Sequence, residues 1–175
     1  MTKLYMFIDV ETTGKNYTAA HWRNNEMLSI SYLLANEQLE ILKKNSFIVN
    51  HTKNGLITKC VNEGISLAEI QTQILNDLAE YKDVTIIPAG NNIHFDVEIV
   101  RRNLPKVFEL FHYSFLDVTS VRKALAMVLP YEVEKIKEAK KLNHNSDVDC
   151  KDARDELVAL LVYVKSLHRI KENFY

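Results

Sequence analysis

The chain has 175 residues, about the length of one folded domain. Hydrophobic residues make up 47% and charged residues 26%, a balance that excludes an intrinsically disordered protein and allows a buried core. The net charge is -1, which argues against a protein that coats nucleic acid through a basic surface alone. Only 4 glycines and 3 prolines are present, and no linker stands out, so we expect a single domain over residues 1–175.

Membrane association and secretion are not expected from the sequence. No apolar run approaches the roughly 20 residues of a membrane-spanning helix, and the N-terminus has no charged lead before a long apolar stretch. The two cysteines, Cys60 and Cys150, lie far apart without a CxxC partner. This arrangement argues against a disulfide framework or a structural zinc site and indicates reduced thiols in a cytoplasmic protein.

Three strands are predicted in the first 50 residues. Residues 4–8 form a continuous apolar run, which is typical of a strand buried on both faces. Residues 28–34 alternate partly, and a third candidate spans about 39–50. Turn-rich stretches separate these segments, which favours an antiparallel meander.

A helix and a buried strand follow. Ser66 and Glu69 have the spacing of a capping box, so a helix is expected to begin at Ser66. Residues 84–87 predict a short buried strand that Pro88 stops. The apolar stripe of the helix consists of Ile70, Ile74, Leu75, Leu78 and Tyr81.

The rest of the chain is predicted to be mainly helical. Residues 96–103 form a helix that ends before a proline, and residues 116–118 form a short fifth strand leading into another helix. The last helix spans about 147–170. The order of elements predicts an α/β protein, a mixed sheet of about five strands flanked by helices. The inner face of the last helix is expected to carry Ala153, Leu157, Leu160, Leu161, Val164 and Leu167.

Two carboxylates stand at the end of the first predicted strand. Side chains alternate along a strand, so Asp9 and Glu11 project from the same face. Adjacent carboxylates beside a buried strand repel each other unless a cation neutralises them, and oxygen ligands suit Mg²⁺ or Mn²⁺. Two solvated carboxylates at a strand end are the alternative interpretation. The following residues 12–14 form a turn at which backbone can approach a phosphate.

A second acidic residue follows the strand at residues 84–87. The chain turns at Gly90 and enters a helix with Asp96 in its first turns, where ligands gather in α/β sheets. On local grounds alone Asp96 is better explained as a helix-start carboxylate stabilised by the helix dipole, and Asn91 is equally a turn residue.

The last helix begins near a third polar cluster. Asp149 shares a helix face with Ala153 and Leu157, so it is expected to point inward, where a buried carboxylate needs a partner such as a metal. His144 would lie beside it, and a neutral imidazole can take a proton from water. The alternative is that Asp147 or Ser146 caps the helix and His144 is a surface loop residue, and local grounds alone favour this alternative.

The order of these clusters resembles that of the DEDDh exonucleases of the ribonuclease H-like fold. The pattern is Asp-x-Glu on a first strand, Asp after a mid-chain glycine turn, then His-x5-Asp at a last helix. The resemblance runs from Leu4 to about Leu167 and includes all five motif residues: Asp9, Glu11, Asp96, His144 and Asp149.

The resemblance implies a metal-dependent 3′→5′ exonuclease that releases nucleoside 5′-monophosphates. The four carboxylates would hold two ions, Mg²⁺ or Mn²⁺, with His144 as general base. Asp9 would bridge both ions. The backbone of Thr12, Thr13 and Gly14 would lie along the terminal nucleotide.

Residues 111–118 resemble a segment of oligoribonuclease, the branch of this family that degrades very short RNAs. In that branch the segment contributes to a homodimer, and its tyrosine and arginine contact the substrate. Tyr113 matches the tyrosine, but Ser114 replaces the arginine. Asn91 and Asn92 follow Gly90 in a turn that resembles the branch's Gly-Asn-Ser turn, and both are expected to contact substrate.

Ser114 leaves the substrate open, because a serine cannot replace the charge of a guanidinium that binds a 5′-phosphate. The expected partners are single-stranded DNA or RNA, or short oligonucleotides. The alternatives are a proofreading-type 3′→5′ DNA exonuclease and a non-catalytic nucleic-acid-binding module. Trp22, in a polar loop, would either stack on a base or anchor the loop to the body.

Overall fold

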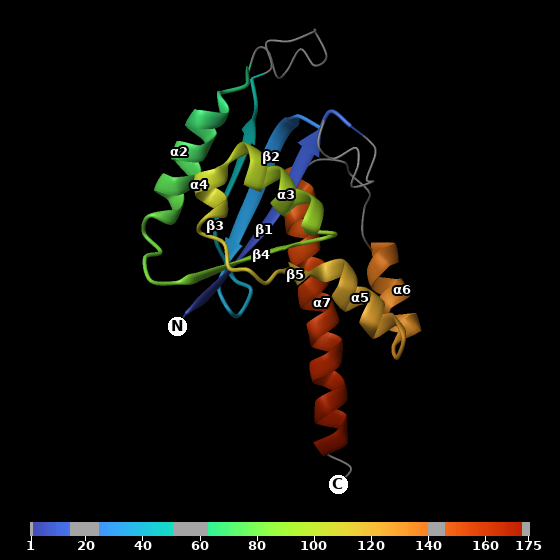
Figure 1. Ribbon diagram of the computed structural model, residues 1–175. Helices are drawn as coiled ribbons and strands as arrows, with labels where there is room; N and C mark the ends of the chain where they lie inside the picture. Colours follow the sequence, from blue (N-terminus) through green and yellow to red (C-terminus); the bar gives the residue numbers. More distant parts are fainter. Residues whose placement is uncertain (1, 15–24, 51–62, 140–145, 173–175) are drawn as a thin grey trace.

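A five-stranded mixed sheet forms the centre of the computed structural model, which describes residues 2–14, 25–50, 63–139 and 146–172 (Figure 1). The strand order is β3-β2-β1-β4-β5. β1 pairs antiparallel with β2 and parallel with β4, so it lies in the middle of the sheet. The strands are β1 (Lys3–Thr12), β2 (Met27–Ala35), β3 (Ile41–Ile48), β4 (Thr85–Gly90) and β5 (Leu116–Asp117).

Helices cover both faces of this sheet, so the predicted α/β fold is confirmed. On one face α2 (Leu67–Leu78), α3 (His94–Asn103) and α4 (Pro105–Phe108) pack against Met6, Ile8 and Val10 of β1. On the other face α5 (Val118–Ala126) and α7 (Ser146–Glu172) pack against Phe7. Because side chains alternate along β1, Asp9 and Glu11 continue the Phe7 face, toward α7.

The predicted capping box of α2 is present. The Ser66 hydroxyl accepts a hydrogen bond from the Glu69 N–H at 3.2 Å, and the Glu69 carboxylate accepts one from the Ser66 N–H at 2.9 Å. These bonds satisfy two backbone donors that a helix start otherwise leaves without partners. Ile70, Ile74 and Leu78 of the predicted stripe are buried in the core.

The sequence predicts that this strand stops at Pro88. In the structure β4 continues through Pro88 to Gly90. The Thr85 N–H donates to the Thr2 carbonyl oxygen, on the side of β4 that faces β1. The Ile86 carbonyl oxygen accepts from the His112 N–H, on the other side of β4. Residues two apart direct their backbone groups to the same side, so the nitrogen of Pro88 faces the β5 side. β5 pairs with β4 only from Ala89 onward, so no ladder bond is lost at the proline.

The helical part of the chain differs from expectation in two places. The sequence had predicted neither α4 nor α6 (Pro130–Ala139). In α7 the expected inner residues Ala153, Leu157 and Leu160 are buried, but Leu161 and Val164 are about 40% exposed. The cause is visible in Figure 1, where the second half of α7 extends beyond the sheet and has no layer to pack against. No helix in the described ranges is long and apolar enough to cross a membrane.

Candidate active site

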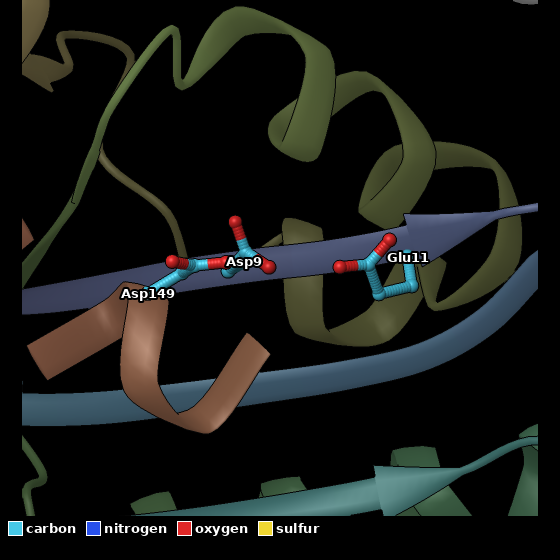
Figure 2. A group of neighbouring side chains, drawn as sticks. All are labelled: Asp9, Glu11 and Asp149. Carbon is cyan, nitrogen blue, oxygen red and sulfur yellow. The ribbon is translucent and has the colours of Figure 1, made fainter. Parts of the chain in front are cut away.

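Three carboxylates from two elements meet beside the end of β1. Asp9 and Glu11 lie on β1, and Asp149 lies in the first turns of α7 (Figure 2). Each offers an oxygen atom, and these atoms all lie within 4.8 Å of one another. Asp149 reaches this position because Ala153 and Leu157, on the same face of α7, are buried against the sheet. The inward orientation predicted for Asp149 is therefore confirmed.

Asp96 is the most buried of the predicted acidic residues, with 5% of its surface exposed. It lies in the first turn of α3, and one carboxylate oxygen accepts a hydrogen bond from the Val10 N–H at 2.9 Å. Burial raises the pKa of the Asp96 carboxyl well above its usual value, and the Asp9 carboxylate raises it further. Glu11 acts in the same direction more weakly. Asp96 therefore belongs to the same electrostatic cluster as Asp9 and Glu11.

The turn between β4 and α3 brings Asp96 to this cluster. β1 and β4 are parallel, so their carboxyl ends lie at the same edge of the sheet. Gly90 has φ 155°, and a Cβ atom there would lie 3.0 Å from the Ile8 carbonyl oxygen. Asn92 has φ 52°, a left-handed conformation that asparagine tolerates better than most residues. A glycine and an asparagine thus allow the chain to turn tightly against β1 before α3 begins.

The donor set fits hard divalent cations. Carboxylate oxygens are the ligands that Mg²⁺ and Mn²⁺ prefer, whereas Zn²⁺ sites usually include cysteine or histidine. Carboxylates crowded at one sheet edge repel one another, and the Asp9 and Glu11 carboxylates add to the effect of burial in raising the pKa of Asp96. A divalent cation would remove that repulsion. The residues present therefore match the expected metal chemistry.

The turn after β1 lies next to the acidic cluster. Thr13 donates its N–H to the Glu26 carbonyl oxygen at 3.0 Å, and its hydroxyl accepts from the Glu26 N–H at 3.1 Å. The Thr12 hydroxyl donates to the Gly14 carbonyl oxygen at 3.3 Å. A Cβ atom on Gly14 would lie only 2.0 Å from the Asn25 side-chain oxygen. These contacts fix the three residues predicted to lie along the terminal nucleotide.

The remaining predicted site residues have different placements. Asn91 is half-buried and Asn92 exposed in the β4–α3 turn, while Tyr113 is 88% exposed. The Ser114 hydroxyl shares a 2.6 Å hydrogen bond with the Nδ1 atom of His112. His144 and Trp22 lie outside the described residues, so their roles stay predictions.

Sequence reasoning missed Asp117, which organises the β4–α3 turn from the neighbouring strand. One of its carboxylate oxygens accepts hydrogen bonds from the N–H groups of Asn92 and Thr119, each at 3.1 Å. The other oxygen accepts from the Ser120 hydroxyl at 2.7 Å. Asp117 is the N-cap of α5. An aspartate directly before a helical pattern is the signal that would have indicated this capping role.

The chain is similar in sequence to oligoribonucleases, although no family model matches it. It is 24% identical over 182 residues to a probable oligoribonuclease of Dictyostelium discoideum. The aligned region covers 93% of this chain and 91% of that protein. The oligoribonuclease of Dichelobacter nodosus is 25% identical over 170 residues, covering 87% and 89%. The similarity thus extends over nearly the full length of both proteins.

Solved structures of exonuclease I share the fold. E. coli exonuclease I in complex with a 5cy-dT13 oligonucleotide has a TM-score of 0.67 at 14% identity, covering 89% of this chain and 40% of that chain. A zinc-bound complex of the same enzyme with single-stranded DNA has a TM-score of 0.69 at 15% identity, covering 98% and 43%. The chain spans less than half the length of these structures. The predicted ribonuclease H-like fold is confirmed.

Proposed function

We propose that this protein is a metal-dependent 3′→5′ exonuclease that releases nucleoside 5′-monophosphates from single-stranded nucleic acid or short oligonucleotides. The observation that carries the proposal is the convergence of Asp9, Glu11, Asp96 and Asp149 from three elements at one edge of the sheet. A protein that only binds nucleic acid needs no such crowding of negative charge. Similarity to oligoribonucleases over nearly the whole chain supports the same activity.

Each residue has a defined part in this proposal. The four carboxylates would hold two Mg²⁺ or Mn²⁺ ions, and Asp9, which lies between Glu11 and Asp149 (Figure 2), would be the ligand common to both ions. Bound divalent ions supply Lewis-acid stabilisation of the charge on the scissile phosphate. His144 accepts the proton of the attacking water. The turn at Thr12, Thr13 and Gly14 supports the terminal nucleotide through its backbone, and Asn91 and Asn92 contribute further substrate contacts.

Similarity in sequence and similarity in structure point to different substrates. The curated relatives are oligoribonucleases, whereas the solved neighbours are exonuclease I bound to single-stranded DNA oligonucleotides. Ser114, which is hydrogen-bonded to His112, offers no positive charge for a 5′-phosphate. We therefore propose single strands of several nucleotides as substrates alongside short oligonucleotides, with single-stranded DNA cleavage as the second candidate activity.

A homodimer is part of the proposal. Leu110, Tyr113 and Phe115 are 43%, 88% and 37% exposed, so an apolar and aromatic surface lies in and beside the segment that resembles oligoribonuclease. Exposed aromatic side chains are enriched where proteins associate. We also propose a single-domain, cytoplasmic protein, because the two cysteines lie far apart in the sequence without a CxxC partner.

One assay tests the proposed activity. The protein is incubated with 5′-labelled single-stranded DNA, single-stranded RNA, duplex DNA and dinucleotides, each with Mg²⁺, with Mn²⁺ or with EDTA. We expect a 3′→5′ ladder on single strands that requires metal and disappears in Asp9→Ala. Glu134→Ala, which removes an exposed carboxylate of α6 outside both the acidic cluster and the proposed dimer surface, is the matched control and is expected to keep full activity.

The outcomes separate the alternatives. Cleavage that survives EDTA or Asp9→Ala contradicts the proposed mechanism. Nucleic-acid binding without cleavage under every condition indicates a non-catalytic module. Rapid loss of dinucleotides with persistence of longer strands favours an oligoribonuclease activity despite Ser114, whereas preference for DNA strands favours the second candidate.

A further inference from the structure

A chain of polar side chains links the β4–α3 turn to α7. The Thr119 hydroxyl donates to the side-chain oxygen of Asn91 at 3.2 Å and accepts from the Nη2 atom of Arg122 at 3.4 Å. The Nη1 atom of Arg122 donates to Glu156 of α7 at 2.5 Å. We call Asn91, Thr119, Arg122 and Glu156 the β4–α7 relay.

The relay is built from buried groups. Thr119 is 4% exposed and Glu156 5% exposed, and the side chain of Arg122 is 21% exposed. A buried ion pair rarely stabilises a fold more than an apolar pair of the same volume, because both charges lose their hydration. Such pairs are better explained by the geometry that they impose. The geometry imposed here is the placement of α7 relative to the β4–α3 turn.

Both ends of the relay lie close in sequence to a carboxylate of the acidic cluster. Glu156 follows Asp149 by seven residues, about two helical turns, so the two side chains share a face of α7. Asn91 precedes Asp96 by five residues, in the turn that starts α3. Asp117 holds the same turn through the N–H groups of Asn92 and Thr119. A single hydroxyl, that of Thr119, therefore connects the elements carrying Asp96 and Asp149.

We propose that the β4–α7 relay sets the separation of Asp96 and Asp149, and that Thr119 is the positioning residue at its centre. The inference rests on the proposed function, because it assigns the relay to the metal site of that function. Groups hydrogen-bonded to a metal ligand change metal affinity by about 10- to 100-fold when they are removed, and the relay acts one step further away, through the elements that carry the ligands. Loss of the relay should therefore weaken metal binding before it unfolds the protein.

The decisive comparison is between two substitutions at Thr119. Thr119→Val keeps the shape of the side chain and removes the hydroxyl, whereas Thr119→Ser keeps the hydroxyl. Mn²⁺ affinity is measured by isothermal titration calorimetry on the full chain. We expect Thr119→Val to bind Mn²⁺ about tenfold more weakly than the wild type. Thr119→Ser is expected to bind within about twofold, because the relay is intact.

A second pair of variants separates positioning from general destabilisation of α7. Arg122→Met breaks the relay, and Arg154→Met removes two hydrogen bonds from α7 to the Leu39 carbonyl oxygen, outside the relay. Both are expected to lower the melting temperature. Only Arg122→Met is expected to weaken Mn²⁺ binding and to lower kcat/KM in the nuclease assay. If Arg122→Met does not fold, Thr119→Val alone decides.

The results distinguish failure of the inference from failure of the proposed function. A wild type that binds Mn²⁺ and cleaves, with unchanged Mn²⁺ affinity in folded Thr119→Val, overturns the inference alone. Equal weakening in Thr119→Val and Thr119→Ser, or in Arg122→Met and Arg154→Met, also overturns it. A wild type that binds no Mn²⁺ overturns both the inference and the proposed function. If Mn²⁺ binding depends on Thr119 but no cleavage occurs, the role inferred for the relay is supported and the proposed exonuclease activity is contradicted.

Discussion

At the scale of single residues, Asp96 combines burial with a place beside two other carboxylates. Asp96→Asn keeps an oxygen that accepts from the Val10 N–H but removes the charge. We expect cleavage to fall by roughly 100-fold or more, because one of the four proposed metal ligands is lost. We expect the unfolding free energy of the metal-free protein to rise at neutral pH, because the substitution removes a buried charge beside the Asp9 carboxylate. Urea unfolding in EDTA measures the gain.

The pH dependence of this effect has a defined sign. The pKa of Asp96 is raised in the folded protein, so the stabilisation from its protonated form is complete below its ordinary pKa of 3.8. That stabilisation is lost as the pH rises through the folded-state pKa. The advantage of Asp96→Asn over the wild type should therefore grow with pH in EDTA. An advantage that stays constant from pH 4 to 8 would contradict the raised pKa.

Residues of the candidate site differ in how far sequence predicts them. Asp9 and Glu11 follow from strand alternation, and Asp149 from its spacing to Ala153 and Leu157, because local periodicity determines each direction. The burial of Asp96 depends on contact with Val10, 86 residues away, which no local pattern encodes. Its inclusion in the site came from the order of motifs along the chain.

At the scale of elements, the capping box is a local feature that both sequence and structure contain. Ser66→Ala removes the hydroxyl that accepts from the Glu69 N–H and donates to the Glu69 carboxylate. We expect the free energy of unfolding to fall by about 1 kcal/mol, because a backbone donor at the start of α2 loses its partner. Chemical denaturation measures the loss, and Thr72→Ala on the exposed face of α2 is the control.

The loss of unfolding free energy caused by Ser66→Ala should depend on pH. Hydrogen bonds from the Ser66 hydroxyl and backbone lower the pKa of Glu69 below its ordinary value of 4.5. A lowered carboxyl pKa contributes stability above the ordinary pKa and loses it as the pH falls. The difference between wild type and Ser66→Ala should thus narrow below about pH 4.5. If the difference in unfolding free energy between wild type and Ser66→Ala widens in acid, the stabilisation by the capping box does not depend on the charge of Glu69.

Most elements were predictable because their patterns are local. The strands at residues 4–8 and 28–34 and the helix after Ser66 carry clear periodicity or capping signals. The prediction that Pro88 ends the strand was wrong, because a proline disrupts a strand only when its nitrogen faces a hydrogen-bonded neighbouring strand. The order of strands in the sheet determines which side has such a neighbour. The exposure of Leu161 and Val164 likewise depends on where the sheet ends, not on the helix itself.

At the scale of the whole molecule, the sheet topology assembles a site that no segment contains. The parallel pairing of β1 and β4 brings Asp9, Glu11 and Asp96 to one edge, and packing of α7 across β1 adds Asp149. The fold class was predictable from the order of strands and helices. The substrate was not, because substrate choice depends on exposed side chains such as Tyr113, whose contacts no local sequence pattern determines.

Metal binding should stabilise the entire fold through this site. The folded protein holds four carboxylates together against their repulsion, while the unfolded chain separates them. At a Mn²⁺ concentration about 100 times the dissociation constant, the stabilisation is about 2.7 kcal/mol. For a chain of this length that corresponds to a rise in melting temperature of roughly 5–10 °C. Calorimetry or fluorescence-monitored melting, with and without Mn²⁺, measures the rise.

The origin of such a rise can be located with two controls. EDTA should reverse it, and NaCl at the same ionic strength should give a much smaller effect, because monovalent ions only screen the repulsion. Asp9→Ala should abolish the Mn²⁺-dependent rise, whereas Glu134→Ala should retain it. If Asp9→Ala melts at a higher temperature in Mn²⁺ just as the wild type does, the ion binds elsewhere, and the carboxylates at the edge of β1 do not form the metal site.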